Sequence, residues 1–70
     1  MTPLDRHIGR RIREKRMLLR ITPNDFQTRL NVSDAELTLY ETGERRVPAT
    51  LLVKIGRLLD EPVTYFFNDR

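Results

Sequence analysis

Two helix-start signals near the middle of the chain restrict its fold more than any other feature. Residues 22–25, Thr-Pro-Asn-Asp, place a hydroxyl at the N-cap, a proline at the first helical position and a carboxylate three residues after the cap. Residues 33–36, Ser-Asp-Ala-Glu, form a second capping box. Asn31 and Gly43 tolerate the left-handed conformation that ends a helix. These signals predict two short helices joined by a turn of about three residues.

Apolar side chains recur at helical spacing on both sides of this pair. Leu4, Ile8, Ile12 and Leu19 form one stripe, and a wider stripe runs from Leu51 to Leu59. The patterns predict an all-α fold, a single domain over residues 1–70, with five helices near residues 4–19, 23–30, 34–42, 48–59 and 63–67. The central pair is the helix-turn-helix arrangement, in which the first helix braces the second and leaves it free to enter a DNA major groove.

The composition excludes several classes of function. The chain has no cysteine and a single histidine, His7, so it offers no thiolate metal site and no catalytic constellation. We therefore expect no enzyme activity, no metal, no cofactor and no small-molecule ligand. We also expect a cytoplasmic protein without membrane contact, because no run of about 18 apolar residues and no secretory leader is present.

Charge is distributed unevenly along the chain. The net charge is +3, but residues 1–20 carry seven basic and two acidic side chains, whereas residues 31–44 carry four acidic side chains and no basic one. A basic surface favours a polyanionic partner such as DNA. The acidic segment coincides with the second helix of the central pair, where DNA contact is expected.

One set of residues, in a single ungapped register, runs through all five expected helices. It comprises residues 8–13 with Arg16, then Thr22, Phe26, Leu30, Val32 and Ser33, then Leu37, Tyr40, Glu41 and Gly43, and finally Leu52, Ile55 and residues 62–67. In these residues the chain resembles the Xre/Cro family of phage-repressor-like bacterial transcription regulators. The resemblance implies a five-helix repressor-like fold and a dimer on a palindromic operator in double-stranded DNA. It also implies a structural salt bridge between Arg16 and Glu41.

The positions that the resemblance assigns to base contact hold unusual side chains. They are Ser33, Asp34, Ala35, Thr38 and Leu39. Specific base recognition mostly uses arginine on guanine and asparagine or glutamine on adenine, and none of these side chains is present here. Carboxylates in this segment also repel phosphates. We therefore expect weak base recognition.

Affinity for DNA is expected to come mainly from the phosphate backbone. The candidate phosphate contacts are Arg10, Arg13, Thr22, Arg45 and Arg46. The favoured function is a DNA-binding transcription regulator, such as a repressor. An alternative remains, because the helix is acidic and Pro23 stands where the family usually has a DNA-contacting glutamine. In that alternative the chain is a degenerate helix-turn-helix module that antagonises or heterodimerises with a related regulator.

The C-terminal end carries consecutive aromatic side chains, which predict self-association. Tyr65, Phe66 and Phe67 cannot all face one small core. An exposed aromatic patch on a small domain usually marks an interface. We expect a weak twofold homodimer through Tyr65, Phe66 or Phe67 and part of the helix over residues 48–59. In the alternative, Phe66 caps the core and the other two side chains are only partly exposed.

Overall fold

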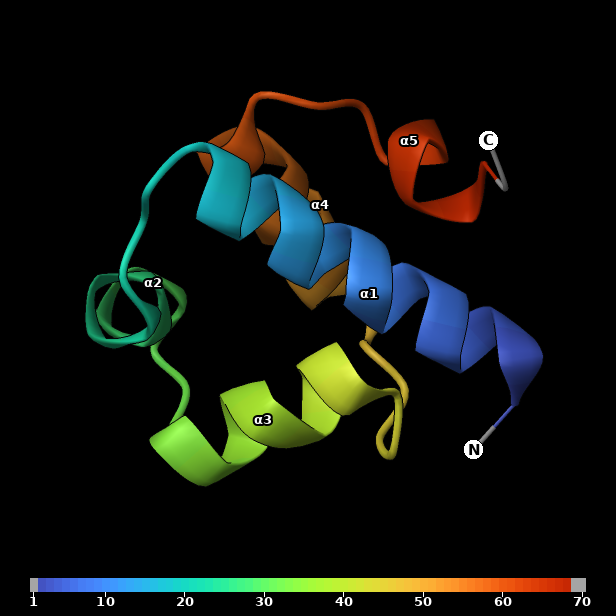
Figure 1. Cartoon of the computed structure of the whole chain (residues 1–70), viewed down its shortest axis with the longest axis horizontal. Helices are drawn as coiled ribbons and strands as arrows, with labels where there is room; N and C mark the ends of the chain where they lie inside the picture. Colours follow the sequence, from blue (N-terminus) through green and yellow to red (C-terminus); the bar gives the residue numbers. More distant parts are fainter. Residues whose placement is uncertain (1, 69–70) are drawn as a thin grey trace.

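Five helices follow one another along the chain, and no strand occurs among residues 2–68, which the computed structural model describes. They are α1 (Pro3–Leu18), α2 (Pro23–Leu30), α3 (Asp34–Thr42), α4 (Ala49–Leu59) and α5 (Thr64–Phe67) (Figure 1). The expected all-α, five-helix fold is confirmed. Each of the five elements begins and ends within one residue of its expected bounds. No helix in this part of the chain is long and apolar enough to cross a membrane.

The predicted caps are present at both ends of α2 and α3. The Thr22 hydroxyl accepts a hydrogen bond from the Asp25 amide at 3.1 Å, and Ser33 does the same for Glu36 at 3.1 Å. Asn31 and Gly43 are left-handed, with φ of 57° and 81°. These local signals fix the helix ends with little dependence on the rest of the fold.

Three further helix-end features were not among the sequence predictions, although residues 2–5, Thr-Pro-Leu-Asp, repeat the pattern of residues 22–25. Thr2 caps α1 by accepting from the Asp5 amide at 3.1 Å. Arg20 and Asp60 adopt left-handed φ angles of 59° and 56°, although neither is glycine or asparagine. Arg20 follows the end of α1, and the Ile21 amide after it returns to the Arg16 carbonyl at 3.0 Å. α1 therefore ends at Leu18, one residue before its expected end.

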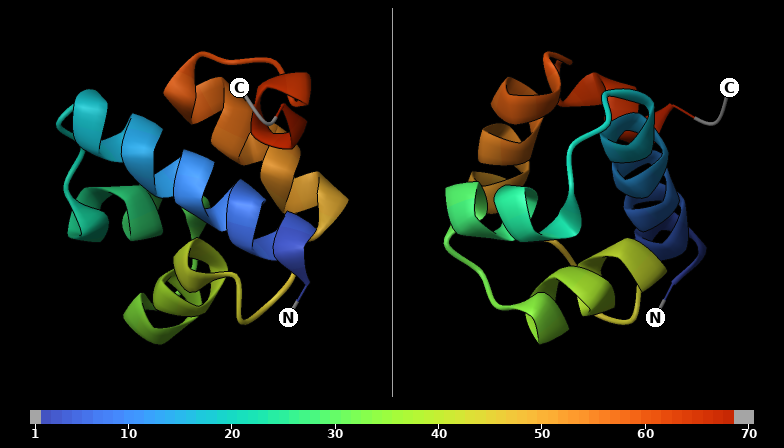
Figure 2. Two further views of the ribbon diagram at one scale, coloured as in Figure 1. Left: turned by 45° about the vertical axis from the view of Figure 1, so that its right-hand side comes forward. Right: turned by 60° about the vertical axis from the view of Figure 1, so that its left-hand side comes forward.

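α1 lies at the centre of the fold. It packs against α3, α4 and α5, while α2 packs against α3 and α4 (Figure 2). The core between these helices is closed by five completely buried side chains, which are Ile12, Phe26, Ile55, Leu59 and Phe66. With so small a core, the buried apolar contacts of α1 contribute strongly to stability.

The expected apolar stripe of α1 is only half correct. Ile8 and Ile12 are buried, but Leu4 is 49% exposed and Leu19 is 43% exposed. The buried arc of α1 instead includes Asp5, Gly9 and Arg16, because this helix faces α3 as well as the apolar core. A stripe drawn through apolar residues alone therefore misses the side of α1 on which polar groups are buried.

Gly9 sets how closely α1 and α3 approach. A Cβ atom there would press on the Tyr40 carbonyl oxygen and lie 2.7 Å from the Glu41 carbonyl oxygen. The two backbones are thus in direct contact, and a side chain at position 9 would force them apart.

Arg16 and Glu41 form a buried ion pair beside this crossing. Arg16 Nε donates to Glu41 Oε2 at 2.7 Å, and its Nη2 donates to Oε1 at 3.2 Å. The third donor, Nη1, reaches the Ile21 carbonyl at 3.0 Å. The two side chains are only 8% and 10% exposed. One planar guanidinium therefore joins α1, α3 and the segment that leads into α2.

We predict that Arg16→Met destabilises the protein by about 3–5 kcal/mol, because it leaves the Glu41 carboxylate buried without its partner. Urea unfolding followed by circular dichroism measures the free energy. Arg13→Met removes an exposed arginine from the same helix and should change stability by less than about 0.5 kcal/mol. Replacing both partners, as Arg16→Met with Glu41→Met, should recover part of the loss. A cost for Arg16→Met as small as that of Arg13→Met would contradict this role.

Candidate nucleic-acid interface

α2 and α3 form a rigid unit around a three-residue turn. The Asn31 amide returns to the Thr28 carbonyl at 3.2 Å, and the Val32 amide returns to Gln27 at 3.0 Å, which closes α2. Ser33 then caps α3 in an extended conformation. Both helix ends are thus satisfied by neighbouring groups, and α2 and α3 also pack against each other, so the turn and this packing together set the angle between them.

The side of α3 that faces away from the core carries most of the predicted base-contact residues. Leu37 and Tyr40 are buried, whereas Asp34, Ala35 and Thr38 are exposed. Leu39 is only half-buried, so its side chain offers part of its apolar surface. The Thr38 hydroxyl donates to the Asp34 carbonyl at 3.1 Å, which leaves its oxygen free to accept. The outward surface therefore carries a carboxylate and small side chains and is short of hydrogen-bond donors.

Glu36 serves the helix cap. Its Oε1 accepts from the Ser33 amide at 3.0 Å, while its own amide donates to Ser33 Oγ at 3.1 Å. The hydrogen bonds from Ser33 hold the pKa of Glu36 below its ordinary value. The Ser33 oxygen uses one of its two lone pairs in this cap, so its hydroxyl proton and its second lone pair remain for another partner. The predicted capping box between Ser33 and Glu36 is thus formed.

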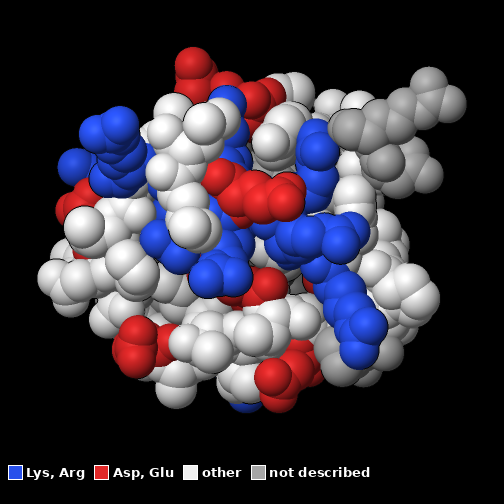
Figure 3. Space-filling view, in the orientation of Figure 1, with Lys and Arg blue, Asp and Glu red and all other residues white. Residues whose placement is uncertain are grey.

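A groove of about 520 Å³ separates α3 from α1 and the start of α2. Its floor includes the Arg16–Glu41 pair, and Arg13, Pro23 and Asp34 stand around it. In the space-filling view basic side chains gather across the middle of the molecule around a central carboxylate, and further carboxylates lie along the lower edge (Figure 3). The basic surface therefore borders the outward side of α3 and does not coincide with it.

The structure divides the predicted phosphate contacts into two groups. Arg10, Arg13 and Arg45 have exposed side chains. Arg46 is also exposed, but its Nε pairs with Asp5 Oδ1 at 3.3 Å. The hydrogen bond with Thr2, followed by the pairing with Arg46, lowers the pKa of the buried Asp5. Arg46 therefore ties the loop after α3 to α1, a structural role that its sequence context did not indicate.

The N-terminus of α2 offers little to a phosphate. Thr22 is exposed and its oxygen caps the Asp25 amide, so its hydroxyl proton is the one donor that its side chain can offer. Pro23 has no amide proton at the first helical position. The Asp25 carboxylate, paired with Arg29 at 3.2 Å, adds negative charge to the first turn. This helix end is thus a weaker anion site than its geometry alone would allow.

The aromatic residues of α5 do not form one exposed patch. Phe66 is completely buried, so its expected place at a dimer contact is wrong. It fills the core because α5 packs against α1 and the Phe66 ring lies beside Gly56 of α4. Tyr65 is half-buried, and the Arg11 guanidinium stacks 4.0 Å from its ring centroid. Only Phe67 is largely exposed, at 48%.

Phe67 borders an apolar groove that the sequence did not predict. The groove has a volume of about 370 Å³ and lies between the start of α1, α4, α5 and the loop before α4. Leu4 and Val53, which are 49% and 42% exposed, line it together with Phe67. Three separate elements thus contribute to one apolar surface, which is why no single sequence stripe reveals it.

Residues 2–68 contain no cluster of three or more histidine, aspartate or glutamate side chains that could hold a metal ion.

Comparisons with known proteins agree with this geometry. The model of the helix-turn-helix family HTH_3 matches residues 12–66. The chain is 35% identical over 66 residues to an uncharacterized transcriptional regulator in the ATPase CF(0) region of Rhodospirillum rubrum, covering 94% of this chain and 61% of that protein. It is 36% identical over 67 residues to an uncharacterized HTH-type transcriptional regulator of Sinorhizobium medicae, covering 96% of this chain and 48% of the relative. The chain thus spans about half to three fifths of the length of these relatives.

A solved structure has the same fold. The restriction-modification controller protein C.AhdI from Aeromonas hydrophila superposes with a TM-score of 0.80, over 89% of this chain and 94% of that one. The sequences are 21% identical, so the likeness concerns the arrangement of the helices.

We predict that stability falls on acidification partly through Glu36. Its pKa is below the ordinary value of 4.5 in the folded chain, so its contribution is present above that pH and is lost as the pH falls further. Glu36→Gln can still accept from the Ser33 amide but cannot titrate, and it should flatten the acid limb of stability against pH. Glu14→Gln, at an exposed position on α1 that forms no cap, is the control for lost charge. Chemical unfolding at a series of acidic pH values measures both, and equal acid limbs for Glu36→Gln and the parent would contradict the assignment.

Proposed function

This chain belongs to the helix-turn-helix family HTH_3, and we propose that it is a cytoplasmic transcription regulator that binds double-stranded DNA as a homodimer. In this proposal α3 lies in the major groove of a palindromic site, and phosphate contacts supply most of the affinity. The observation that carries the proposal is the exposed outward side of α3 on a rigid α2–turn–α3 unit.

The chemistry of α3 supports weak base recognition. Thr38, whose hydroxyl proton is engaged by the Asp34 carbonyl, can accept at a base edge, and Ala35 and Leu39 can contact a thymine methyl group. Asp34 can accept from a cytosine amino group, although its carboxylate also repels the neighbouring phosphates. None of these contacts equals the bidentate pairing of arginine with guanine, so we infer modest discrimination between sequences.

The exposed arginines around α3 support backbone contact. Arg45 follows the C-terminal end of α3, and its amide is fixed by a hydrogen bond to the Leu39 carbonyl at 3.1 Å. Arg10 and Arg13 lie on α1, and Arg13 borders the groove beside α3. Arg46 contributes less in this proposal, because Asp5 already neutralises its charge.

The apolar groove beside Phe67 supports the homodimer. Leu4, Val53 and Phe67 expose apolar surface at one end of the molecule, and such a continuous patch on a small domain favours self-association. A twofold contact would place α4 and α5 of each copy against the other. Phe67 then provides the kind of aromatic anchor that protein–protein interfaces commonly use.

We predict that Arg45→Ala weakens binding to all duplexes alike and reduces the slope of log affinity against log salt by about 0.9. Thr38→Arg should instead raise affinity for all duplexes, since it adds a charge and donors to the outward side of α3. Fluorescence anisotropy with a random-sequence duplex at several salt concentrations measures both effects. Arg57→Ala, which removes an exposed arginine from α4, is the matched control and should leave the slope unchanged.

Two outcomes of this titration would contradict parts of the proposal. Tight binding to one operator that persists at high salt would show that base contacts dominate. Absence of binding to any duplex at low salt would reject DNA binding itself.

We predict that Phe67→Glu weakens the homodimer by about tenfold or more, because it places a charge at the centre of an apolar contact. Sedimentation equilibrium up to high micromolar concentration measures the monomer–dimer distribution. Leu18→Glu is the matched control, because Leu18 is 73% exposed at the opposite end of α1. A parent protein that remains monomeric throughout, or an equal effect of Leu18→Glu, would remove the proposed interface.

The acidic character of α3 favours a second candidate function. In this candidate the chain is a degenerate helix-turn-helix module that heterodimerises with a related regulator and antagonises it. Pro23 and Asp25 weaken the α2 anion site, and Asp34 stands on the outward side of α3, which are the specific observations in its favour. Failure to bind any duplex, combined with inhibition of DNA binding by a related regulator mixed with it, would support this candidate over the first.

A further inference from the structure

The outward side of α3 carries two parallel rows of side chains. Asp34 and Thr38 are four residues apart, and so are Ala35 and Leu39, so the members of each pair stack along the helix axis. Thr38 is also three residues from Ala35, which makes the two rows neighbours on the helix surface. A row of oxygen-bearing side chains therefore runs beside a row of apolar side chains.

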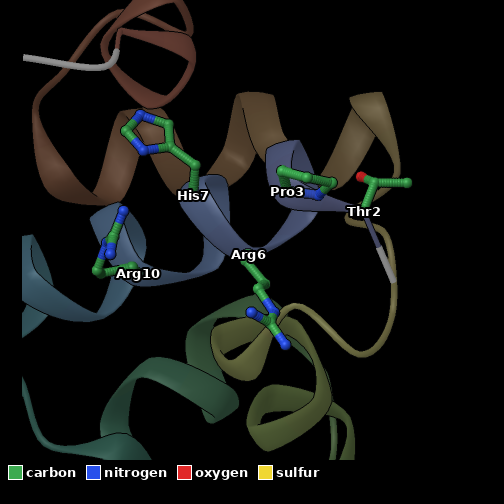
Figure 4. Close-up of a pocket in the computed structure, with 5 residues that line it drawn as sticks. All are labelled: Thr2, Pro3, Arg6, His7 and Arg10. Atoms are coloured by element: carbon green, nitrogen blue, oxygen red, sulfur yellow. The ribbon is translucent and has the colours of Figure 1, made fainter.

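The oxygen-bearing row acts only as a hydrogen-bond acceptor. The Thr38 hydroxyl donates its proton to the Asp34 carbonyl at 3.1 Å, so its oxygen is left to accept. A carboxylate such as Asp34 also only accepts, and it forms no ion pair among residues 2–68. Nitrogen donors stand on α1 instead, where Arg6 points toward the end of α3 and His7 points toward α5 (Figure 4).

The apolar row requires an apolar partner on the base. Ala35 is exposed, and Leu39 is half-buried, so part of the Leu39 surface stays accessible while the packing of α3 restrains it. The apolar group that a base edge presents in the major groove is the methyl group at C5 of a pyrimidine. The two rows together therefore select a base edge on which an amino donor lies beside a methyl group.

We propose that this surface recognises 5-methylcytosine in duplex DNA, an inference that rests on the proposed entry of α3 into the major groove. The N4 amino group of this base lies next to its C5-methyl group, so a single base edge satisfies both rows. Cytosine supplies the amino donor without the methyl group. Thymine supplies the methyl group beside its O4 acceptor, which the Asp34 carboxylate repels. Adenine has an amino donor but no methyl group, and guanine presents two acceptors.

Methylation separates this contact from the electrostatic cost of Asp34. The phosphates of a methylated and an unmethylated duplex are the same, so their repulsion of the carboxylate cancels in the ratio of the two affinities. The remaining difference is one methyl group buried against Ala35 and Leu39, which corresponds to about a fourfold gain in affinity for each contacted base. Thymine in place of 5-methylcytosine should lower affinity by about tenfold, because an acceptor replaces the donor.

The test is a competition between two random-sequence duplex pools, one made with cytosine and the other with 5-methylcytosine in its place. Different flanking sequences identify the two pools after the bound DNA is recovered and sequenced. The most enriched sequence is then synthesised with 5-methylcytosine, cytosine or thymine at each enriched position. Fluorescence anisotropy measures the three affinities, and 5-methylcytosine should give the highest.

Variants of α3 assign the two halves of the contact. Ala35→Ser and Leu39→Ala should each bring the ratio of 5-methylcytosine to cytosine affinity close to one. Asp34→Ala should leave that ratio unchanged and abolish the preference for 5-methylcytosine over thymine. Leu18→Ala and Glu14→Ala, at exposed positions on α1, are the matched controls and should change neither ratio. Ala35→Ser keeps the size of an exposed side chain, so the test does not depend on Leu39→Ala remaining folded.

Higher affinity for the methylated duplex that Ala35→Ser and Leu39→Ala both remove supports the recognition of 5-methylcytosine by α3. Equal affinities for the methylated and unmethylated duplexes would overturn it and leave DNA binding through α3 intact. A preference for methylated DNA that both variants retain would overturn the assignment to these side chains. Binding to neither pool would reject the proposed function as well.

Discussion

The bidentate pairing of Arg16 with Glu41 is the interaction on which the arrangement of the helices depends. It joins α1 to α3, and the Arg16 guanidinium also holds the segment that leads into α2 through the Ile21 carbonyl. A buried pair of this kind adds little net stability compared with apolar packing, but it is expensive to break one-sidedly. Its contribution here is geometrical, since a planar fork with three occupied donors permits only one placement of α3 on α1. Gly9 reinforces that placement by bringing the two backbones into contact at the same crossing.

The sequence predicted the elements of the fold well because their ends are encoded locally. The caps at Thr22 and Ser33 and the left-handed residues Asn31 and Gly43 each act within one turn of their own position. The burial of side chains was predicted less well, because it depends on which elements meet. Leu4 was expected inside and is half exposed, while Phe66, one of the three residues favoured for a dimer contact, is completely buried and so takes the alternative place in the core. Both errors have the same origin. Whether an apolar side chain faces the core or solvent was judged without knowing where α5 packs.

The candidate site could be predicted to a similar degree. The outward positions of α3 follow from helical periodicity once Leu37 and Tyr40 are recognised as inward, so Asp34, Ala35 and Thr38 are exposed as expected. The partners of charged groups were harder to predict. Arg45 and Arg46 are adjacent and chemically identical, yet only Arg46 pairs with Asp5, which is distant in sequence. A capping threonine before Asp5 is the one local signal that could have indicated a buried carboxylate in need of a cation.

The four sides of α1 explain how so small a chain can combine several roles. One side, with Gly9 and Arg16, positions α3, and a second, with Ile8 and Ile12, completes the core. On a third side His7, Arg11 and Lys15 hold residues 61–68 through Asn68, the Tyr65 carbonyl at 2.9 Å and Glu61 at 2.9 Å.

The hydrogen bond to Glu61 raises the pKa of Lys15, so the Lys15–Glu61 ion pair persists wherever the glutamate is ionised. The fourth side, with Arg6, Arg10 and Arg13, faces solvent.

Because α3 and α5 are both fixed to the same rigid helix, the outward side of α3 and the apolar groove beside Phe67 keep a constant separation. A regulator that contacts two half-sites of DNA as a dimer needs that property, since its half-site spacing is set by the rigid distance between the DNA-contacting helix and the dimer contact. The outward residues of α3 can therefore vary without disturbing this distance, whereas Gly9, Arg16 and Glu41 cannot.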